Sequence, residues 1–365
     1  MTAGAGYAGV DHMTIKWGVI GCGGIAYRRT IPEGIVPAPS AELVAVMDSD
    51  QAVARRVGDD FGVESHSDEA AILGRPDVQV VYIASPAYLH AEQVLGALKA
   101  DKHVFCEKPL ALTTGECSRV VQVAEERRLK LGVGFMMRYH AHHRRAAELV
   151  RSGDLGQVSF VRAQLTTWYP PMVGAWRQDP ALGGGGALVD MGCHCIDLLE
   201  SILQSSVVEL SAFAGSPVHR YAVDDTAVVL LEFENGTVGT VDVSFGVPDE
   251  CSRNRLEIYG SNASLLAEGT IGQGVGGTMI IHRRTDSDYD AQQKRESGQG
   301  GTSVTVQPVN TYRAEIEAMS KAVADDTRPE VSGEDGLWSQ RIMEACYRSA
   351  RDGRNSRLSR GDAGS

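Results

Sequence analysis

Short apolar runs alternate with helix-like stretches along residues 15 to 136, and this alternation constrains the fold more than any other feature of the sequence. The apolar runs are Ile15–Gly21, Glu42–Asp48, Val78–Ser85, His103–Cys106 and Leu129–Met136. The helix-like stretches between them are Asp50–Phe61, Ser67–Leu73, His90–Ala100 and Thr114–Arg128. Strands that alternate with helices form βαβ units, and continuously apolar strands are typical of a parallel sheet covered on both faces. We therefore expect an α/β domain built on a doubly wound parallel sheet.

The pattern changes after about residue 140, where most of the remaining segments are strand-like. Helices are expected at Ala141–Ser152 and Leu188–Leu203, with a strand between them at Gln157–Thr167. An Asn-Gly pair, which is a strong hairpin signal, separates strands at Thr226–Glu234 and Thr237–Phe245. The series continues with strands at Arg255–Tyr259, Thr278–Arg283 and Thr302–Val309, a surface loop at Thr285–Gly301, and helices at Tyr312–Ala324 and Gly336–Asp352. These segments predict a second, α+β domain with an open, mainly antiparallel sheet.

Composition excludes several classes of partner. The net charge of −12 repels phosphate backbones and anionic lipid, so we expect neither nucleic acid nor membrane as a partner. No apolar run approaches the roughly 20 residues of a membrane-spanning helix. The seven cysteines are an odd number scattered over a long chain, which is typical of reduced thiols in a cytoplasmic protein.

A glycine motif follows the first apolar run. Gly21, Cys22, Gly23, Gly24, Ile25 and Ala26 read G-x-G-x-x-A between a strand and an expected helix, as in the dinucleotide-binding turn of a Rossmann domain. Asp48, at the end of the second run, can bind the two hydroxyls of an adenosine ribose and would repel a 2′-phosphate. We therefore expect NAD as the cofactor. NADP stays possible because Arg28 and Arg29 lie nearby, and Asp48 could also be only a solvated acid at a strand end.

Lys108 follows the fourth apolar run, at the edge of the sheet where ligands of open α/β folds bind. Pro109 keeps the chain out of a helix there and helps to fix the direction of the lysine. A lysine near a nicotinamide can polarise a carbonyl or stabilise an alkoxide. The alternative is an ordinary surface lysine.

The stretch GGGGALVDMGCHCIDLL, residues 183 to 199, carries a second set of chemical groups. On a helix Asp190, His194 and Asp197 share one face, whereas Cys193 and Cys195 project to either side of His194. The two thiols therefore cannot join His194 in a metal site. The best other source of ligands is the run at His140, His142 and His143, which is typical of a polar helix start. We therefore expect no metal. His194 could act as a general base oriented by Asp190, or it could be a satisfied core histidine. Asp197 is interpreted as structural.

These motifs together resemble the Gfo/Idh/MocA family of oxidoreductases. The resemblance runs from Ile15 to Leu358 and rests on Gly21–Ala26, Ser85–His90, GALKADKHVFCEKPLALT from Gly96, the glycine run with DMGCHCIDLL, and SGEDGLWSQRIMEACYRSARDG from Ser332. It implies a Rossmann domain followed by an open sheet, with the substrate between them. It further implies that Lys108 is catalytic with Asp190 and His194 as partners. Cofactor contacts are implied at Ser85, Pro86, His90 and Glu107, and a substrate contact at Arg138.

Weaker substrate candidates lie in the proline-punctuated stretch before the glycine run, which also contains Trp168 and Tyr169. Trp176 could stack on a sugar face and Arg177 could donate to hydroxyls, although both could equally be packing residues. Tyr312, at the start of a late helix, could also reach the site. We expect a leader at 1–12, a cofactor domain at 13–138, a substrate and oligomerisation domain at 139–358, and a frayed tail at 359–365.

The leading hypothesis is a cytoplasmic NAD-dependent dehydrogenase that oxidises a secondary hydroxyl of a sugar, cyclitol or sugar derivative. One alternative is an NADPH-dependent reductase of a keto-sugar such as an anhydro-sugar, which Asp48 argues against. Others are a glycoside hydrolase that uses NAD for transient oxidation, and a non-enzymatic sensor with a dinucleotide pocket. An exposed face of the second sheet would suit a homo-oligomer, either a dimer or a tetramer.

Overall fold

The computed structural model describes residues 14–285, 291 and 300–360. The expected leader at 1–12 lies outside the described residues, as do most of the expected surface loop at 285–301 and most of the expected tail. Within the described ranges, no helix is both long enough and apolar enough to cross a membrane.

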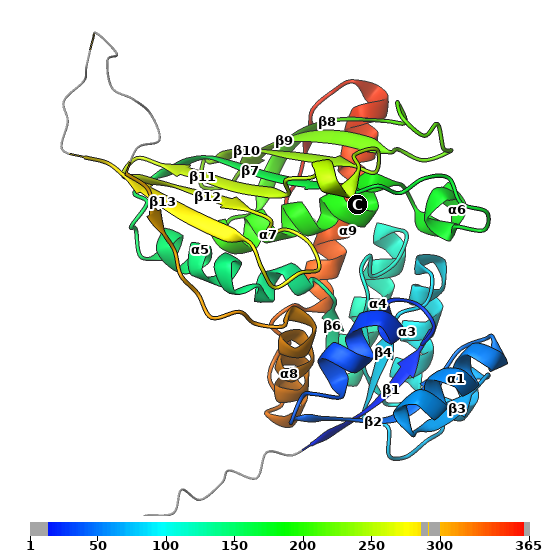
Figure 1. Ribbon diagram of the computed structural model, residues 1–365. Coiled ribbons are helices and arrows are strands. Elements are labelled where there is room, and N and C mark those ends of the chain that lie inside the picture. The colour runs from blue at the N-terminus through cyan, green and yellow to red at the C-terminus, as the bar shows by residue number, and fades with distance from the viewer. Residues whose placement is uncertain (1–13, 286–290, 292–299, 361–365) are drawn as a thin grey trace, which may run out of the picture.

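The first half of the chain folds around a six-stranded, fully parallel sheet with the strand order β3-β2-β1-β4-β5-β6 (Figure 1). Its strands are β1 (Ile15–Ile20), β2 (Ala41–Met47), β3 (Glu64–His66), β4 (Val80–Ile83), β5 (His103–Cys106) and β6 (Leu131–Val133). The helices that connect them are η1 (Ala26–Ile35), α1 (Gln51–Phe61), α2 (Glu69–Leu73), η2 (Ala87–Leu89), α3 (His90–Lys99) and α4 (Thr114–Arg127). The strand order reverses between β1 and β4, so this parallel sheet confirms the predicted doubly wound fold and places a ligand crevice beyond the ends of those strands.

Local sequence explains where these helices begin and end. The side chain of Asp50 accepts N–H groups from the first turn of α1, which ends at Gly62 in the left-handed conformation. Thr113 and Glu116 form a reciprocal capping box at the start of α4. All four residues of β4 are buried, as expected for a strand with helices on both faces.

The second half forms a nine-stranded sheet in the order β14-β13-β12-β11-β7-β10-β9-β8-β15. Its strands are β7 (Val158–Thr166), β8 (Val207–Gly215), β9 (Thr226–Phe233), β10 (Val238–Ser244), β11 (Arg255–Gly260), β12 (Ala263–Glu268), β13 (Thr278–Arg283), β14 (Thr302–Ser303) and β15 (Ser356–Arg357). Every pair is antiparallel except β7 with β10, which confirms the mainly antiparallel prediction. The strand expected at Thr302–Val309 ends at Ser303, and Pro308, which has no N–H, could not have continued its ladder.

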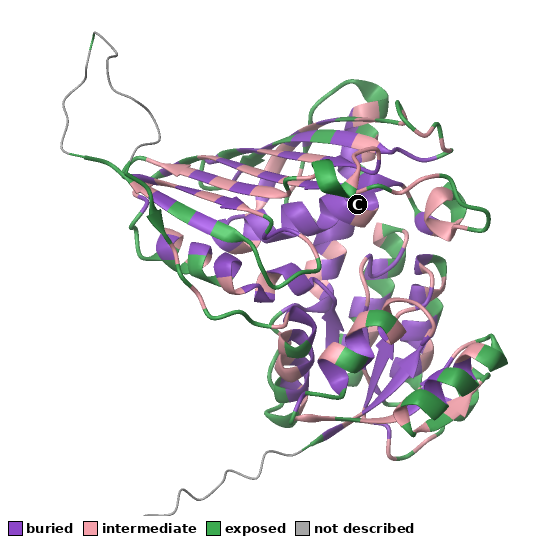
Figure 2. Cartoon of the chain, in the orientation of Figure 1, coloured by how far each residue is buried: buried purple, intermediate pink, exposed green. Residues whose placement is uncertain are grey.

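Helices cover only one face of this second sheet (Figure 1). The helical segments of this half are η3 (Met136–Tyr139), α5 (Ala141–Arg151), η4 (Trp176–Gln178), α6 (Pro180–Gly183), η5 (Leu188–Gly192), α7 (Cys193–Leu203), η6 (Asp249–Cys251), α8 (Thr311–Ala324) and α9 (Gly333–Asp352). Along β9, buried and exposed residues alternate strictly from Ala227 to Phe233, as Figure 2 shows by colour. The exposed set on the uncovered face includes Phe213, Val228, Leu230 and Val238.

One late helix, α8, packs against the first sheet and not the second. Ile316 and Met319 of α8 share an apolar cluster with Trp17 of β1 and Phe105 of β5. The indole Nε1 of Trp17 donates to Ser320 Oγ at 3.1 Å. The division of the chain at residues 138 and 139 stays a prediction, and by its packing α8 belongs with the first sheet.

Candidate active site

The glycine loop after β1 lies directly against the end of β4. Gly21 has a φ of +79°, and a Cβ at this position would lie 2.5 Å from the backbone nitrogen of Ser85. Only glycine fits there, both because of its conformation and because of this close approach. A Cβ at Gly24, in contrast, would have no atom within 4 Å, so this side of the loop is open to a ligand. Cys22 is fully buried and faces the core, and Ile25 directly precedes η1.

Asp48 lies beside this loop, as the sequence predicted from the end of the second strand. Its Oδ2 accepts the N–H of Gly23 at 3.0 Å, and its Oδ1 accepts the N–H of Asp50 at 3.1 Å. The carboxylate therefore links the glycine loop to the start of α1. This is the position from which an acid can bind the ribose hydroxyls of a dinucleotide.

The turns after β4 and β5 are joined through His90. Its Nδ1 lies 2.7 Å from the carbonyl oxygen of Pro109, and its Nε2 lies 2.9 Å from that of Ser85. Burial lowers the pKa of His90. The Ser85 hydroxyl is bonded to Gln93, so the side chains of Ser85 and His90 are occupied within the protein. Pro86 precedes η2 at the same edge of the sheet.

Lys108 and Asp190 form the centre of the site. The ammonium Nζ of Lys108 donates to the backbone oxygen of Asp190 at 2.6 Å and to its Oδ1 at 2.8 Å. Arg177 Nε donates to the same Oδ1 at 3.2 Å. Burial would lower the pKa of Lys108, but Asp190 and Cys193 together outweigh burial and raise it. Burial would raise the pKa of Asp190, but Lys108 and Arg177 together hold it well below its usual range.

His194 follows Asp190 on the same helical segment, which begins as the π-helical turn η5 and continues as α7. The imidazole is 8% exposed and meets the ring of Phe135 edge-on at 5.7 Å. Burial, with a contribution from Lys108, lowers the pKa of His194 to about 3, although Asp190 partly opposes this. Its Nδ1 is buried without a hydrogen-bond partner among the described residues. The ring is therefore neutral at physiological pH.

The two cysteines that flank His194 are buried, consistent with packing positions on the helix. Among the residues that the structure describes, no three His, Cys, Asp or Glu side chains are grouped so that they could hold a metal ion. The preceding glycines pack closely: a Cβ at Gly185 would lie 2.1 Å from the hydroxyl of Tyr347, and one at Gly186 would lie 1.8 Å from the carbonyl oxygen of Asp224.

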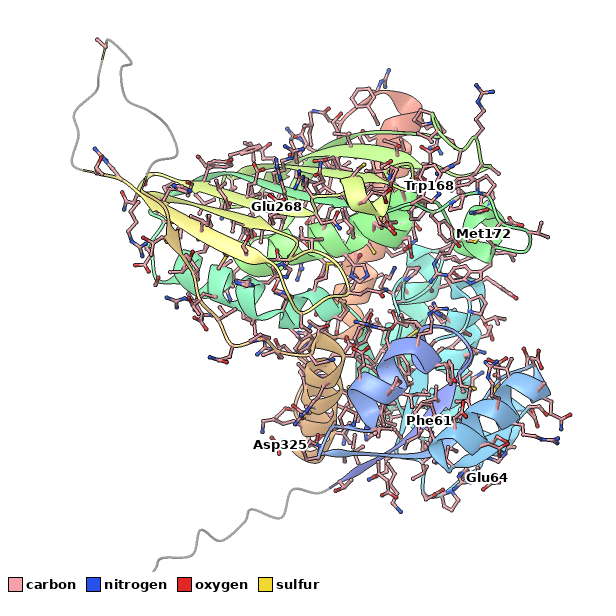
Figure 3. The ribbon with its side chains drawn as sticks, viewed as in Figure 1. Phe61, Glu64, Trp168, Met172, Glu268 and Asp325 are labelled. Atoms are coloured by element: carbon pink, nitrogen blue, oxygen red, sulfur yellow. The ribbon has the colours of Figure 1, made fainter. Side chains whose placement is uncertain are left out.

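Some of the remaining residues that the sequence predicted to bind substrate lie at this site, and others lie elsewhere in the fold. Trp176 joins the site, because the guanidinium of Arg177 lies 4.2 Å from the centre of its ring. Tyr169, which the sequence named as part of the same stretch, lies near Arg177 and Asp190. Burial is the main cause that raises the pKa of its hydroxyl; Arg177 lowers this pKa and Asp190 raises it. Figure 3 shows Trp168 and Met172 on the same exposed segment between β7 and α6.

Arg138 does not join the Lys108 group. Its Nε donates to Asp197 Oδ2 at 2.8 Å, its Nη2 binds Asp197 Oδ1 at 2.5 Å, and Asp335 lies 3.4 Å from the same nitrogen. The guanidinium thus binds two carboxylates and ties η3 to α7 and α9, and a substrate contact at Arg138 stays a prediction. Asp197 is accordingly part of an ion pair.

The side chains of Glu107 and Tyr312 have partners other than Asp190. Glu107 Oε1 accepts the hydroxyl of Tyr82 at 2.6 Å, and removal from water raises its pKa. Tyr312 is buried on α8, with the guanidinium of Arg29 5.2 Å from its ring centre. Glu315, one turn further along α8, is 1% exposed, and burial raises its pKa.

Comparison with known proteins identifies relatives over nearly the whole chain. Residues 15–135 match the profile of the oxidoreductase family with an NAD-binding Rossmann fold, and residues 143–266 match that of the GFO/IDH/MocA C-terminal domain. A 1,5-anhydro-D-fructose reductase of Ensifer adhaerens is 27% identical over 95% of this chain and 99% of its own length. A dTDP-3,4-didehydro-2,6-dideoxy-alpha-D-glucose 3-reductase of Actinomadura kijaniata is 30% identical over 93% of this chain and 96% of its own. The structure of an aldose-aldose oxidoreductase from Caulobacter crescentus, at 26% identity, covers 94% of this chain and 100% of its own with a TM-score of 0.84.

Proposed function

Because the chain belongs to the Gfo/Idh/MocA family of NAD(P)-dependent oxidoreductases, we propose that it oxidises a secondary hydroxyl of a sugar, a cyclitol or a sugar derivative with NAD. The observation that carries this proposal is the convergence of Lys108 Nζ and Arg177 on the carboxylate of Asp190, on the helix of His194. The names of the relatives, which act on keto-sugars and aldoses, support the substrate class.

The residues at the sheet edge fit a dinucleotide. Gly21 allows the tight turn, Gly24 leaves open space, and Asp48 stands where the adenosine ribose would lie. Bound in this way, the nicotinamide would supply the hydride acceptor. The turns at Ser85, Pro86 and Glu107 would line its site, with His90 holding two of them together.

Charge decides the roles of the two titratable groups nearest the reacting carbon. Lys108 is protonated and held by Asp190, so its ammonium can donate to the substrate oxygen and stabilise negative charge as it develops there. His194 is neutral, so its imidazole can accept the hydroxyl proton. Asp190 orients Lys108, while Arg177 and Trp176 would contact the other hydroxyls and one face of the substrate.

The assembly and location are also proposals. The uncovered face of the second sheet exposes Phe213, Leu230 and Val238, and burying such apolar side chains favours a homo-oligomer through this face. All seven cysteines are free, which supports a cytoplasmic location.

The test is absorbance of reduced nicotinamide with NAD or NADP against a panel of polyols, aldoses and glycosides. Net reduction of NAD would support the proposal if Lys108→Met abolishes it and Lys99→Met retains it. Lys99 is an exposed lysine on α3 and serves as the control. The names of two relatives favour a second candidate function, reduction of a keto-sugar. The same site would catalyse this reaction with reduced cofactor, and the reverse assay detects it. Glycoside cleavage without net reduction of NAD, or no turnover in either direction, would overturn the proposed dehydrogenase function.

A further inference from the structure

A single aspartate, Asp224, holds the start of the helix that carries Asp190 and His194. Its Oδ1 accepts the N–H of Gly186 at 3.0 Å, and its Oδ2 accepts the N–H of Leu188 at 2.8 Å. The N–H of Ala187, between them, donates to the backbone oxygen of Asp224 at 2.9 Å. Three consecutive N–H groups at this helix start therefore bind one residue, and the N–H of Gly186 also donates to the hydroxyl of Tyr347 at 3.2 Å.

This arrangement replaces an ordinary helix cap. The first N–H groups of a helix lack partners within it, and a Ser, Thr, Asp or Asn just before the helix usually supplies one. Here the preceding residues are glycines, and Ala187 offers no side-chain cap. The close contacts of Gly185 with Tyr347 and of Gly186 with Asp224 leave no room for a Cβ, so the glycine run is what allows the distant carboxylate to reach the helix.

Asp224 is itself fixed from a third element. The hydroxyl of Tyr347, on α9, donates to Asp224 Oδ1 at 2.6 Å. Asp224 is 7% exposed, so its carboxylate depends on these protein donors and has little access to water. The start of η5 is thus tied to the turn before β9 and, through Tyr347, to α9.

The position of this helix start matters for the site because Lys108 binds the backbone of Asp190 as well as its side chain. The Lys108 Nζ to Asp190 oxygen distance is 2.6 Å, and Asp190 lies only two residues beyond Leu188. A movement of the first turn would therefore move both acceptors of Lys108 at once. We infer that Asp224 is a positioning residue of the proposed dehydrogenase, which sets the place of Asp190 against Lys108 by capping the helix from a distance.

The neighbouring residue provides a matched control. Asp225 is fully buried, and its carboxylate also accepts several hydrogen bonds, including those from the N–H groups of Val218 and His219 at 2.9 and 2.6 Å. Its other donors are the hydroxyls of Ser216 and Thr226. None of these donors lies on η5 or α7. Asp225→Asn should therefore cost stability in the same part of the fold without moving Asp190.

The experiment compares Asp224→Asn, Tyr347→Phe and Asp225→Asn in the full chain. An amide nitrogen cannot accept an N–H bond, so Asp224→Asn should loosen the helix start and lower kcat by about 10- to 100-fold, as small misplacements of catalytic groups do. KM for NAD should change less than about twofold, because the glycine loop is untouched. Tyr347→Phe, which keeps the carboxylate, should show the same pattern more weakly, and it is the informative variant if Asp224→Asn does not fold.

The pH profile separates positioning from general loss of stability. Lys108 faces a fixed set of titratable and charged groups, which are Asp190, Arg177, Cys193, His194, His90 and Glu107. Of these, Asp190 raises the pKa of Lys108 most. Weakening that contact should shift the basic limb of kcat/KM to lower pH in Asp224→Asn. Asp225→Asn should show no shift, whatever its loss of thermal stability.

A readout independent of activity completes the test. Amide hydrogen exchange should rise in residues 186–192 for Asp224→Asn, and in residues 216–219 for Asp225→Asn. Equal losses of kcat in the two aspartate variants, or an unchanged basic limb in Asp224→Asn, would overturn the inference. If the wild-type protein turned over no substrate, the proposed function would fail, and unchanged exchange at 186–192 would separately overturn the positioning role.

Discussion

We predict that His194 will not titrate near pH 6.5, where an exposed histidine normally does. Burial and the nearby Lys108 lower its pKa to about 3, so the ring stays neutral throughout an ordinary dehydrogenase assay. A neutral imidazole can accept the hydroxyl proton at every pH in that range. The profile of kcat/KM between about pH 5 and 9 should therefore lack an acid limb from this residue.

The same shift has a calculable effect on stability. The pKa of His194 is lower in the folded protein than in the unfolded chain, so the unfolded chain binds more protons, and stability is lost as the pH falls below about 6.5. At about pH 5 the loss is 1.36 × (6.5 − 5), or about 2 kcal/mol. The ring is only 8% exposed, so screening by solvent does not reduce this figure much. His194→Gln, which cannot titrate, should lose about 2 kcal/mol less than the wild type between about pH 8 and 5.

Urea unfolding at a series of pH values measures this slope, and initial rates measure activity. His143→Gln is the matched control, because burial also lowers the pKa of His143 to about 3, while its Nδ1 contacts Met137 O outside the Lys108 group. Both variants should flatten the acid slope, but only His194→Gln should lower kcat, by about 10²-fold or more. An acid limb near pH 6 to 7 in the wild type that disappears in His194→Gln would refute the reasoning.

Three further changes test other parts of the site. Lys108→Met should lower kcat by about 10²- to 10⁴-fold with cofactor binding, measured by fluorescence of reduced nicotinamide, nearly unchanged; near-wild-type turnover would exclude its catalytic role. Asp48→Ser should raise the ratio of kcat/KM for NADP to that for NAD by about tenfold or more, because it removes a charge that repels the 2′-phosphate; an unchanged ratio would exclude Asp48 as the discriminator. Glu315→Gln should stabilise the protein more at about pH 8 than at about pH 5. Burial raises the pKa of Glu315 in the folded protein, so the wild type loses stability as the pH rises above the unfolded pKa of about 4.3. An equal effect of the substitution on the urea midpoint at both pH values would contradict this.

The sequence predicted the first sheet almost completely, because parallel strands and their connections carry local signals. Each long strand is an apolar run, and the helices between them begin at capping residues such as Asp50 and Thr113. Only β3 was missed. Its residues Glu64–His66 are polar, partly exposed and lie at the sheet edge, so nothing in their pattern indicates a strand.

The second sheet was predicted less completely because its strands depend on partners far away in the chain. β8, β12 and the two-residue β15 were all missed. β8 contains small and polar residues and is defined by its pairing with β9, and β12 is a short strand paired with β11 and β13. The late helix α8 was predicted as a helix, but its return to the first sheet follows from tertiary contacts of Ile316 and Met319 that no local pattern encodes.

Arg138 illustrates the limit for single residues. The sequence pattern of an arginine after a strand of the first sheet is the same whether its side chain faces a substrate or a carboxylate of another element. The deciding residue, Asp197, lies far along the chain on α7 and was interpreted as structural without a partner. A buried acid needs a cation as its partner, but the sequence does not show which of the 35 lysines and arginines supplies it.

The sequence placed Lys108, Asp190 and His194 together but could not decide which of them accepts the proton. Pairs of titratable groups whose environments push their pKa values apart identify the acid and the base of a site. Here one carboxylate favours a charged Lys108 by direct contact, while burial keeps His194 neutral. Asp190 binds Lys108 through its backbone oxygen as well, so the charge on the lysine depends on where the helix begins. The choice of His194 as proton acceptor therefore depends on the capped turn that Asp224 holds. A variant that frees this turn should reduce the difference in pKa between Lys108 and His194 before it unfolds the protein.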